Sequence, residues 1–278
     1  MIIDHHIHAV RRDPDTPAGF REYLGKSWPG DLDEFLARHE DPAVLEAHMD
    51  EAGIDYAVVL AETNPVTTPM ITNEFVADFC RGRKRFIPFA SINPYLVHNP
   101  AAYLRRLVEE MGFRGLKLYP TYQYYYPNDP MLYPLYAVCQ ELGLPVMAHT
   151  GSSVFPGSRL KYGQPLHFDD VAVDFPDLNL LLCHCGRPIW YDEAFALARF
   201  HRNVYMEISG LPPQKLLTYF PELERLAHKV IYGSDWPGFP SLSANVAAIR
   251  GLPIGEQAKA AILGGNAARL HGLHVNGG

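Results

Sequence analysis

Short apolar runs alternate along the chain with segments that carry the start and stop signals of helices. Eight of these runs are rich in valine, isoleucine, leucine and aromatic residues, which is typical of strands buried on both faces of a parallel sheet. They cover residues 2–8, 54–61, 85–92, 114–119, 144–149, 178–184, 203–208 and 229–233. The pattern therefore predicts eight strands with helical segments between them.

Three of the intervening segments have both helix ends marked. In each, an N-cap residue precedes a proline at the first helical position, and a glycine follows the last turn. These segments run from Asp41 to Gly53, from Asn99 to Gly112 and from Asp129 to Gly143. Further helices are predicted at residues 165–174, 191–201, 213–228 and 254–270.

Strands that alternate with helices fold either into a closed barrel or into an open, doubly wound sheet. An open sheet usually carries a glycine-rich phosphate loop after its first strand, whereas the first strand here ends in histidines. A (β/α)8 barrel needs roughly 250 residues, and this chain has 278, with no internal repeat or long linker. We therefore expect an α/β fold, with a single (β/α)8 TIM barrel as one domain over residues 1–278.

The stretch 10–30 shows no strand run and no helix signal of the kind seen elsewhere. Long loops without structure of their own are often functional. We expect this segment to fold over the barrel mouth as a lid, the alternative being a surface excursion.

The composition and net charge of the chain limit the kinds of molecule that it is expected to bind. Hydrophobic residues make up 47% of the chain and charged residues 20%, an ordinary globular balance, and the net charge is -7. An acidic chain without a basic patch disfavours nucleic acid and anionic membranes as partners. The N-terminus lacks a basic region and a long apolar run, no stretch approaches the roughly 20 apolar residues of a membrane span, and four cysteines are too few for a disulfide scaffold. A cytoplasmic location is expected.

Histidines concentrate at the end of the first predicted strand. The two-residue period of a strand places Asp4, His6 and His8 on one face, with His5 and Ile7 on the other. Two imidazoles at positions i and i+2 can reach one metal ion. An isolated motif of this kind is weak, and a histidine-rich N-terminus without function is the alternative.

Three further polar residues follow other predicted strands. His149 ends the fifth run, His184 ends the sixth, and Asp235 comes directly after the eighth. Active sites of (β/α)8 barrels are assembled at the C-terminal ends of the strands. A single histidine there is commonly structural, but metal-type residues at the matching ends of four strands favour a metal-dependent active site.

The cysteines beside His184 are interpreted as structural. Strand alternation would turn Cys183 and Cys185 away from His184, so both are predicted to pack against the outer helices. Cys80 and Cys139 fall inside predicted helices and are expected in the core.

Several sequence motifs together resemble those of the amidohydrolase-related branch, amidohydrolase 2, of the amidohydrolase superfamily. The matching motifs are DHHIH at 4–8, GLKLYP at 115–120, LPVMAHTG at 144–151, HCG at 184–186, YGSDWP at 232–237 and GNAARL at 265–270. They occur in order over nearly the whole chain. The resemblance is specific for the family and much less so for the substrate.

The resemblance implies a catalytic metal. His6, His8, His149 and Asp235 correspond to the ligands of a single divalent ion, and His184 to the histidine that orients or activates water. Three imidazoles and a carboxylate suit Zn²⁺ with one open position, although Mn²⁺ and Fe²⁺ are compatible. A bound metal lowers the pKa of water to about 7, and His184 or Asp235 would take the proton and return it to the leaving group.

Lys117 leaves the number of metals open. In binuclear members of the wider superfamily a carboxylated lysine on strand 4 bridges two metals, and Lys117 stands at the equivalent strand end. The family resemblance favours one metal, with Lys117 in contact with substrate or with Asp235.

The loops after the strands are expected to line the pocket. Five tyrosines lie between residues 119 and 126, and cationic residues follow strands 5 and 6. Aromatic walls with a few cations suggest a small aromatic or unsaturated substrate with a carboxylate or carbonyl. The candidate substrate-binding residues are Lys117, Tyr119, Arg159, Arg187 and Trp236. Alternatively, the tyrosines pack the barrel rim or a second subunit. The helices are expected to expose Trp190, Tyr219 and Phe220, which suggests a homo-oligomer.

Three functions are compatible with these features. The first is a metal-dependent hydrolase that directs activated water at a lactone, amide or carbon–carbon bond. The second is a nonoxidative decarboxylase of an aromatic or dienoic acid, disfavoured because family decarboxylases are usually longer than this chain. The third is a non-catalytic, metal-containing barrel that binds a ligand, disfavoured because structural zinc sites are closed and rich in cysteine.

Overall fold

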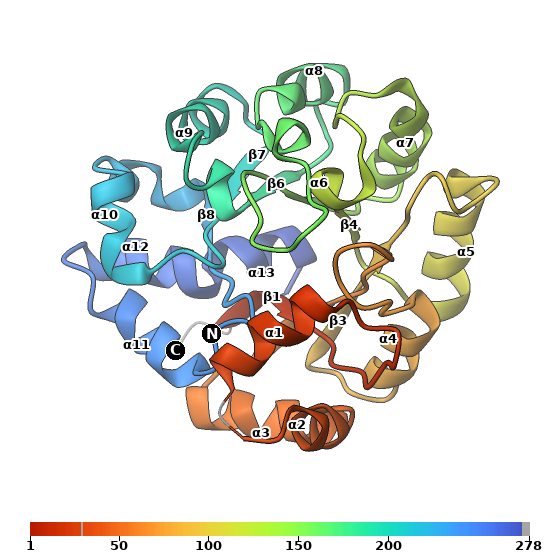
Figure 1. Ribbon diagram of the computed structural model, residues 1–278. Helices are drawn as coiled ribbons and strands as arrows, with labels where there is room; N and C mark the ends of the chain where they lie inside the picture. The colour runs from red at the N-terminus through yellow and green to blue at the C-terminus, as the bar shows by residue number, and fades with distance from the viewer. Residues whose placement is uncertain (29, 274–278) are drawn as a thin grey trace.

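The computed structural model describes residues 1–28 and 30–273. Its eight strands are parallel and hydrogen-bond in sequence order, as a TIM barrel requires (Figure 1). The strands are β1 Ile3–His8, β2 Tyr56–Leu60, β3 Phe86–Ser91, β4 Leu116–Leu118, β5 Val146–His149, β6 Leu180–Cys183, β7 Val204–Glu207 and β8 Val230–Ile231. The predicted fold class is confirmed.

The segment that follows β8 closes the barrel against β1. His5 N donates to Tyr232 O at 3.0 Å, and His8 N donates to Trp236 O at 2.9 Å. Between them, Asp235 N donates to His6 O at 3.0 Å. Closure therefore holds the backbone of Asp235 beside the two histidines that end β1.

Helices surround the strands in Figure 1. The α-helices are α1 Ala18–Ser27, α2 Leu32–His39, α3 Pro42–Ala52, α4 Asn73–Cys80, α5 Pro100–Met111, α6 Pro120–Gln123, α7 Tyr133–Glu141, α8 His167–Asp174, α9 Tyr191–Phe200, α10 Leu216–Tyr219, α11 Leu242–Arg250, α12 Glu256–Ala260 and α13 Asn266–His271. Short 3-10 segments are η1 Pro130–Leu132, η2 Leu160–Gly163, η3 His184–Gly186, η4 Pro213–Lys215 and η5 Leu223–Lys229; η6 Ala261–Gly265 is a π-helical turn. Within the described residues, no helix is both long and apolar enough to span a bilayer.

The sequence signals located some helices well and others poorly. The side chains of Asp41 and Asn99 cap α3 and α5, and Gly53 and Gly112 end them in the left-handed conformation. The predicted helix 213–228 is instead divided among η4, α10 and η5, and 254–270 among α12, η6 and α13. Five helices without a marked proline–glycine pair were not predicted: α1, α2, α4, α6 and α11.

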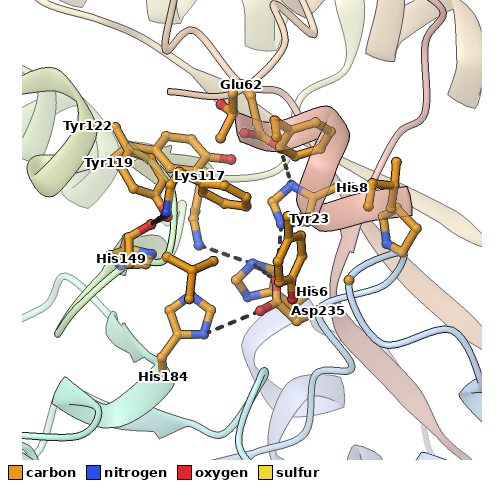
Figure 2. Close-up of a pocket in the computed structure, with 18 of the residues that line it drawn as sticks. His6, His8, Tyr23, Glu62, Lys117, Tyr119, Tyr122, His149, His184 and Asp235 are labelled. Carbon is orange, nitrogen blue, oxygen red and sulfur yellow. Dashed lines mark hydrogen bonds and ion pairs between the residues drawn. The ribbon is translucent and has the colours of Figure 1, made fainter. Parts of the chain in front are cut away.

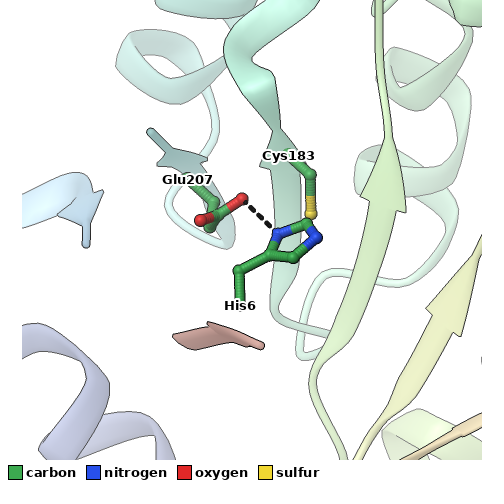
Figure 3. A group of neighbouring side chains, drawn as sticks. All are labelled: His6, Cys183 and Glu207. Carbon is green, nitrogen blue, oxygen red and sulfur yellow. Dashed lines mark hydrogen bonds and ion pairs between the residues drawn. The ribbon is translucent and has the colours of Figure 1, made fainter. Parts of the chain in front are cut away.

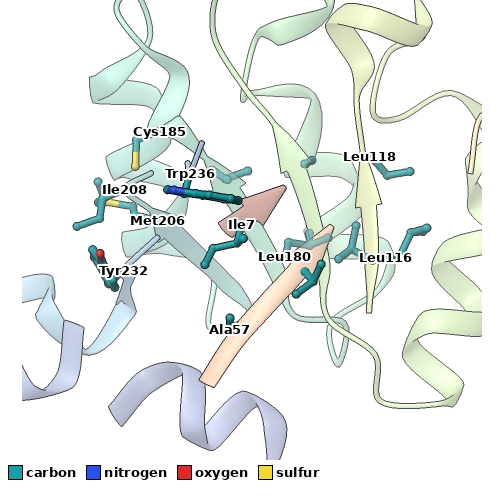
Figure 4. Close-up of a cluster of buried hydrophobic side chains, with 14 of the residues drawn as sticks. Ile7, Ala57, Leu116, Leu118, Leu180, Cys185, Met206, Ile208, Tyr232 and Trp236 are labelled. Carbon is teal, nitrogen blue, oxygen red and sulfur yellow. The ribbon is translucent and has the colours of Figure 1, made fainter. Parts of the chain in front are cut away.

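Side chains alternate between the barrel interior and the layer under the helices. The interior cluster includes Val58, Phe89, Met147 and Leu181. The outer cluster includes alternate positions such as Ala57, Leu116 and Leu180, drawn in Figure 4. Parallel strands covered on both faces need apolar side chains in both directions, which explains the near-continuous apolar runs.

A bulge in β1 corrects the predicted orientation of its side chains. Asp4 pairs with Ala57 and Ile7 with Val59, so β1 uses three residue steps where β2 uses two. A bulge of this kind reverses the inward and outward alternation. His5 consequently packs against Phe89 of the interior cluster, while His6 and His8 enter the pocket. Asp4 does not share their face and accepts hydrogen bonds from His6 N and Ser234 N.

Candidate active site

The two histidines at the end of β1 are each held from behind by a buried glutamate, and Figure 2 shows the pair of His8 with Glu62. His6 Nδ1 lies 3.1 Å from Glu207 Oε2, and His8 Nδ1 forms an ion pair with Glu62 Oε1. A carboxylate beside Nδ1 favours the proton there and leaves Nε2 as the ligand nitrogen. The Nε2 atoms of His6 and His8 lie 3.5 and 3.3 Å from Asp235 Oδ1. Both imidazoles therefore present the metal-binding atom to the same carboxylate.

Asp235 lies at the centre of the cluster. It follows β8 with φ of 66°, an uncommon conformation for a residue other than glycine that is often found at functional sites. Its Oδ2 lies 3.8 Å from both His184 Nδ1 and Arg187 Nη2. Burial alone would raise the pKa of Asp235, but its neighbours His184, His8, His6 and Arg187 hold it well below its ordinary value. Asp235 is therefore an anion at neutral pH.

His184 enters the pocket because the chain turns where β6 ends. Its φ is 63°, so it leaves the strand alternation that would have pointed it outward. Its Nδ1 donates to Ser209 O at 2.9 Å, which leaves Nε2 without a proton. The prediction that Cys183 packs outward was wrong, because Cys183 is the inward residue at the end of β6. Cys185 does belong to the outer cluster, and Cys80 and Cys139 are buried as predicted.

The side chains present fit a divalent metal. Ligand atoms of His6, His184 and Asp235 lie within 4.8 Å of one another, and His8 Nε2 is beside them. Burial lowers the pKa of His6, His149 and His184 well below the ordinary value, which leaves these rings neutral. Neutral imidazoles and an ionised carboxylate are the protonation states that metal binding requires. His8 differs, because burial lowers its pKa but the Glu62 and Asp235 carboxylates outweigh burial and raise it to about 9, so a metal would displace a proton from this ring.

His149 lies next to this group with a different orientation. Its ring centroid is 4.6 Å from that of His184, but its Nε2 lies 3.2 Å from Ser152 O. The structure thus brings together three of the four predicted ligands, His6, His8 and Asp235, with His184. Ligation by His149 remains a prediction.

Lys117 and Cys183 lie deeper in the barrel. Lys117 is fully buried, and its Nζ lies 3.2 Å from Cys183 Sγ and 3.4 Å from His6 Nε2. Figure 3 shows the second group of potential ligands, His6 with Cys183 and Glu207. Burial raises the pKa of Glu207 to about 7. The number of metals stays open. Lys117 was expected to contact substrate or Asp235; its nearest partners are His6 and Cys183, and a contact with substrate remains a prediction.

The pocket above these groups has aromatic walls and encloses about 630 Å³, its open mouth included. Lys117, Tyr119 and Arg187 line it, as predicted, and Arg187 is anchored because its Nη1 donates to Gly210 O at 2.6 Å. The other lining aromatic side chains are Phe20, Tyr23, Tyr122 and Phe155.

Two predicted substrate-binding residues lie outside the pocket lining. Trp236 is buried on the outer side, with its ring 5.6 Å from that of His39, because strand alternation after Asp235 turns it outward. Arg159 is exposed and stacks on Tyr124, with Cζ 4.8 Å from the ring centroid. Phe220, expected on the surface, is also buried.

The segment 10–30 is not a structureless loop, because α1 occupies half of it. Figure 1 shows α1 across the end of the barrel, and Phe20, Tyr23 and Leu24 line the pocket. Phe155, from the loop after β5, packs against the rings of Phe20 and Tyr23 with centroids 5.3 and 5.2 Å apart. The segment therefore forms one wall of the pocket, and its role as a lid remains a prediction.

Glu62 is the charged residue of the pocket lining that sequence reasoning missed. It directly follows the second strand run, so the rule that selected His149 and His184 would have selected Glu62 as well. A single glutamate after a strand is not a metal-binding motif by itself. Its contact with His8 depends on how the barrel strands pair, which the sequence does not show.

Comparisons with known proteins agree with this architecture. A family model described as amidohydrolase matches residues 3–273, and the chain belongs to this amidohydrolase 2 family of the amidohydrolase superfamily. No match was found among curated proteins.

Solved structures with the same fold include proteins of different activity. An uncharacterized TIM-barrel protein from Bordetella bronchiseptica has a TM-score of 0.79 at 24% identity, over 98% of both chains. A 5-carboxyvanillate decarboxylase from Novosphingobium aromaticivorans, with manganese and a nitrobenzoic acid, has a TM-score of 0.72 at 19% identity, over 98% of this chain and 96% of that chain. A probable 2-pyrone-4,6-dicarboxylic acid hydrolase from Acinetobacter baumannii, with citric acid, has a TM-score of 0.69 at 17% identity, over 98% and 99%. At these identities the likeness shows the shared fold.

Proposed function

We propose that this protein is a metal-dependent hydrolase that acts on a carbonyl-type bond of a small, planar, carboxylated substrate. The observation that carries the proposal is the convergence of His6, His8 and His184 on the Asp235 carboxylate. His6 and His8 would hold a single Zn²⁺ or Mn²⁺ ion with Asp235, and His149 would complete the set after its ring turns from Ser152 O. When bound, the metal supplies Lewis acidity that lowers the pKa of water towards neutrality.

The protein's own groups provide the proton transfers. Because His184 donates Nδ1–H to Ser209 O, its Nε2 is free to accept a proton, and its lowered pKa keeps that nitrogen unprotonated at neutral pH. Asp235 is the adjacent anion, and it stabilises His184 once that ring is protonated. General acid–base groups of this type contribute roughly 10²–10⁴-fold to rate.

Arg187 and the aromatic walls of the pocket favour a planar, carboxylated substrate. Arg187 is fixed by Gly210 O, and its Nη2 faces the pocket beside Asp235. A guanidinium held in this way suits a carboxylate. Tyr119, Tyr122 and Phe155 offer flat apolar surface for a planar ring or conjugated chain.

Nonoxidative decarboxylation is the second candidate. The same cation and aromatic walls suit a hydroxybenzoate, and one protein of the same fold is a 5-carboxyvanillate decarboxylase. The argument from chain length loses its support, because the match covers 96% of that decarboxylase chain.

A reconstitution screen tests the proposal. Protein stripped of metal and reloaded with Zn²⁺ or Mn²⁺ is assayed on pyrone carboxylates, lactones, amides and β-dicarbonyls, and separately for carbon dioxide release from hydroxybenzoates. The expected result is hydrolysis that depends on metal and is lost in His184→Ala. Carbon dioxide release without hydrolysis would reverse the order of the two reactions, and a His184→Ala variant with its metal and full activity would remove the proton role of His184.

A further inference from the structure

Glu62 lies in the pocket wall on a backbone that is fixed from both sides. Glu62 N donates to Ile71 O at 2.8 Å, and Ile71 N donates to Glu62 O at 3.0 Å. These two bonds join the ends of the loop that follows β2. The residue is only 3% exposed, so its carboxylate has little freedom to move.

The Glu62 carboxylate has one charged partner. Within residues 1–28 and 30–273, the only ion pair that Glu62 forms is with His8 Nδ1. Burial of a carboxylate is costly unless it is paired and hydrogen-bonded. A buried anion aimed at one imidazole is expensive to retain for packing alone.

The two β1 histidines need this support to different extents. The His6 side chain is 1% exposed, and Ser209 Oγ lies 2.8 Å from its Nδ1 in addition to Glu207. The His8 side chain is 19% exposed and has no such hydroxyl contact among the described residues. Without Glu62, the His8 ring would keep only its Nε2 contact with Asp235 Oδ1 at 3.3 Å and would lose the carboxylate that fixes Nδ1.

We propose that Glu62 is a positioning residue that fixes the His8 ring and tautomer so that Nε2 faces Asp235 and the metal. The inference rests on the proposed function, because it assigns His8 as a ligand. It adds a residue that follows β2 to the candidate metal cluster, whose proposed ligands end or follow β1, β5 and β8. Carboxylates behind ligating histidines typically change metal affinity by 10–100-fold.

Metal affinity tests the inference without a substrate. The full chain is stripped of metal and titrated with Mn²⁺ or Zn²⁺ alone at fixed, near-neutral pH. Glu62→Gln removes the charge with little change of shape, and we expect its affinity to fall about 10–100-fold. Glu62→Asp keeps the charge but retracts it, and we expect an intermediate loss. Glu74→Gln is the control, because Glu74 is an exposed glutamate on α4, and its affinity should equal that of the unchanged protein.

The outcomes separate this inference from the proposed function. If the unchanged protein binds no divalent metal, the proposed function fails. If the unchanged protein binds metal and Glu62→Gln binds it equally well, the positioning role alone is wrong.

Nitrogen NMR of the unchanged, metal-loaded protein tests the predicted tautomer of His8 even if the Glu62 variants do not fold. Imidazole ¹⁵N shifts should show that His8 carries its proton on Nδ1 and is ligated through Nε2. The opposite assignment would overturn the inference.

Discussion

Two neighbouring residues of β1, His5 and His6, occupy opposite ends of the barrel interior and differ in their surroundings. His6 lies among carboxylates, with Glu207 and Asp235 within 3.1 and 3.5 Å of its ring nitrogens. His5 Nε2 lies 2.9 Å from His271 Nε2, and its ring meets Phe89 edge-on at 5.5 Å. Neither His5 nor His271 forms an ion pair with a carboxylate in the part of the chain that the structure describes.

The comparison teaches that the environment decides what a buried histidine does. Both ends keep their imidazoles neutral through burial, which lowers the pKa of His5, His6 and His271. At the end that carries His6, the carboxylates and the open pocket make the rings suitable ligands. At the other end the rings pair with each other against apolar side chains, so we expect that end to serve stability, the usual division in such barrels.

The largest effect on activity is expected from substitution of Asp235, the carboxylate that distinguishes the His6 end of the barrel from the His5 end. Asp235→Asn should lower kcat/KM by roughly 10³-fold, because the cluster loses the anion that faces His6, His8 and His184. Steady-state kinetics and elemental analysis measure the loss of rate and of metal. His271→Gln, at the opposite end, should lower the melting temperature while kcat and metal content stay unchanged. Equal effects of the two variants on metal content would contradict the division between the ends.

Acid should destabilise the fold through the His5–His271 end. Burial lowers the pKa of His271 to about 4, whereas an unfolded histidine has a pKa of about 6.5. The unfolded state therefore binds the proton first as pH falls. The stability that the neutral ring contributes is fully present above pH 6.5 and is lost progressively between pH 6.5 and 4.

The size of this effect follows from the separation of the two pKa values and amounts to roughly 3 kcal/mol at pH 4. Denaturant unfolding of the metal-free protein at pH 7 and pH 4 measures it. In His271→Phe the difference between the two pH values should shrink by about that amount. An unchanged difference would mean that His271 titrates normally in the folded protein.

Two glycines allow the ends to be compared by the same substitution. Gly210 has φ of 64°, and a Cβ there would overlap Arg187 Nη1 and lie 2.5 Å from Asp235 Oδ2. Gly210→Ala should therefore lower kcat/KM by roughly 10–100-fold, because it displaces Arg187 and costs about 1–2 kcal/mol of backbone strain. At the other end, a Cβ on Gly264 would lie 2.5 Å from Met1 O. Gly264→Ala should reduce the melting temperature and leave kcat unchanged. A loss of kcat in Gly264→Ala, with only a lower melting temperature in Gly210→Ala, would contradict the assignment of catalysis to one end of the barrel and stability to the other.

Sequence periodicity sufficed for the barrel because every strand is covered on both faces and therefore reads as an apolar run. The ends of those runs also located His149, His184 and Asp235, since barrel closure brings strand ends together whatever their separation in sequence. Alternation failed where the backbone departs from a regular strand. The bulge in β1 moved His5 inward. Cys183 lies inside the barrel where it was expected outside, and the turn after β6 brings His184 into the pocket as expected.

The contacts that refine the site could not be predicted from the sequence. Glu62 and His8 are brought together by pairing of β1 with β2, and the pair has no periodic signal of its own. The helix α1 lacks a side-chain cap, which explains why the segment that contains it was expected to be a loop.

The smallest expected effect concerns the attachment of α1 to the pocket. Trp28 Nε1 donates to Pro237 O at 2.8 Å and so joins the end of α1 to the loop that carries Asp235. Trp28→Phe keeps most of the ring but removes the donor, which should cost about 1 kcal/mol. If α1 serves only as a wall and lid, that loss should appear as a KM about fivefold higher with kcat unchanged. A fall in kcat at unchanged KM would show instead that the bond acts through Pro237 on Asp235. The position of α1 and the geometry of the metal cluster would then be coupled.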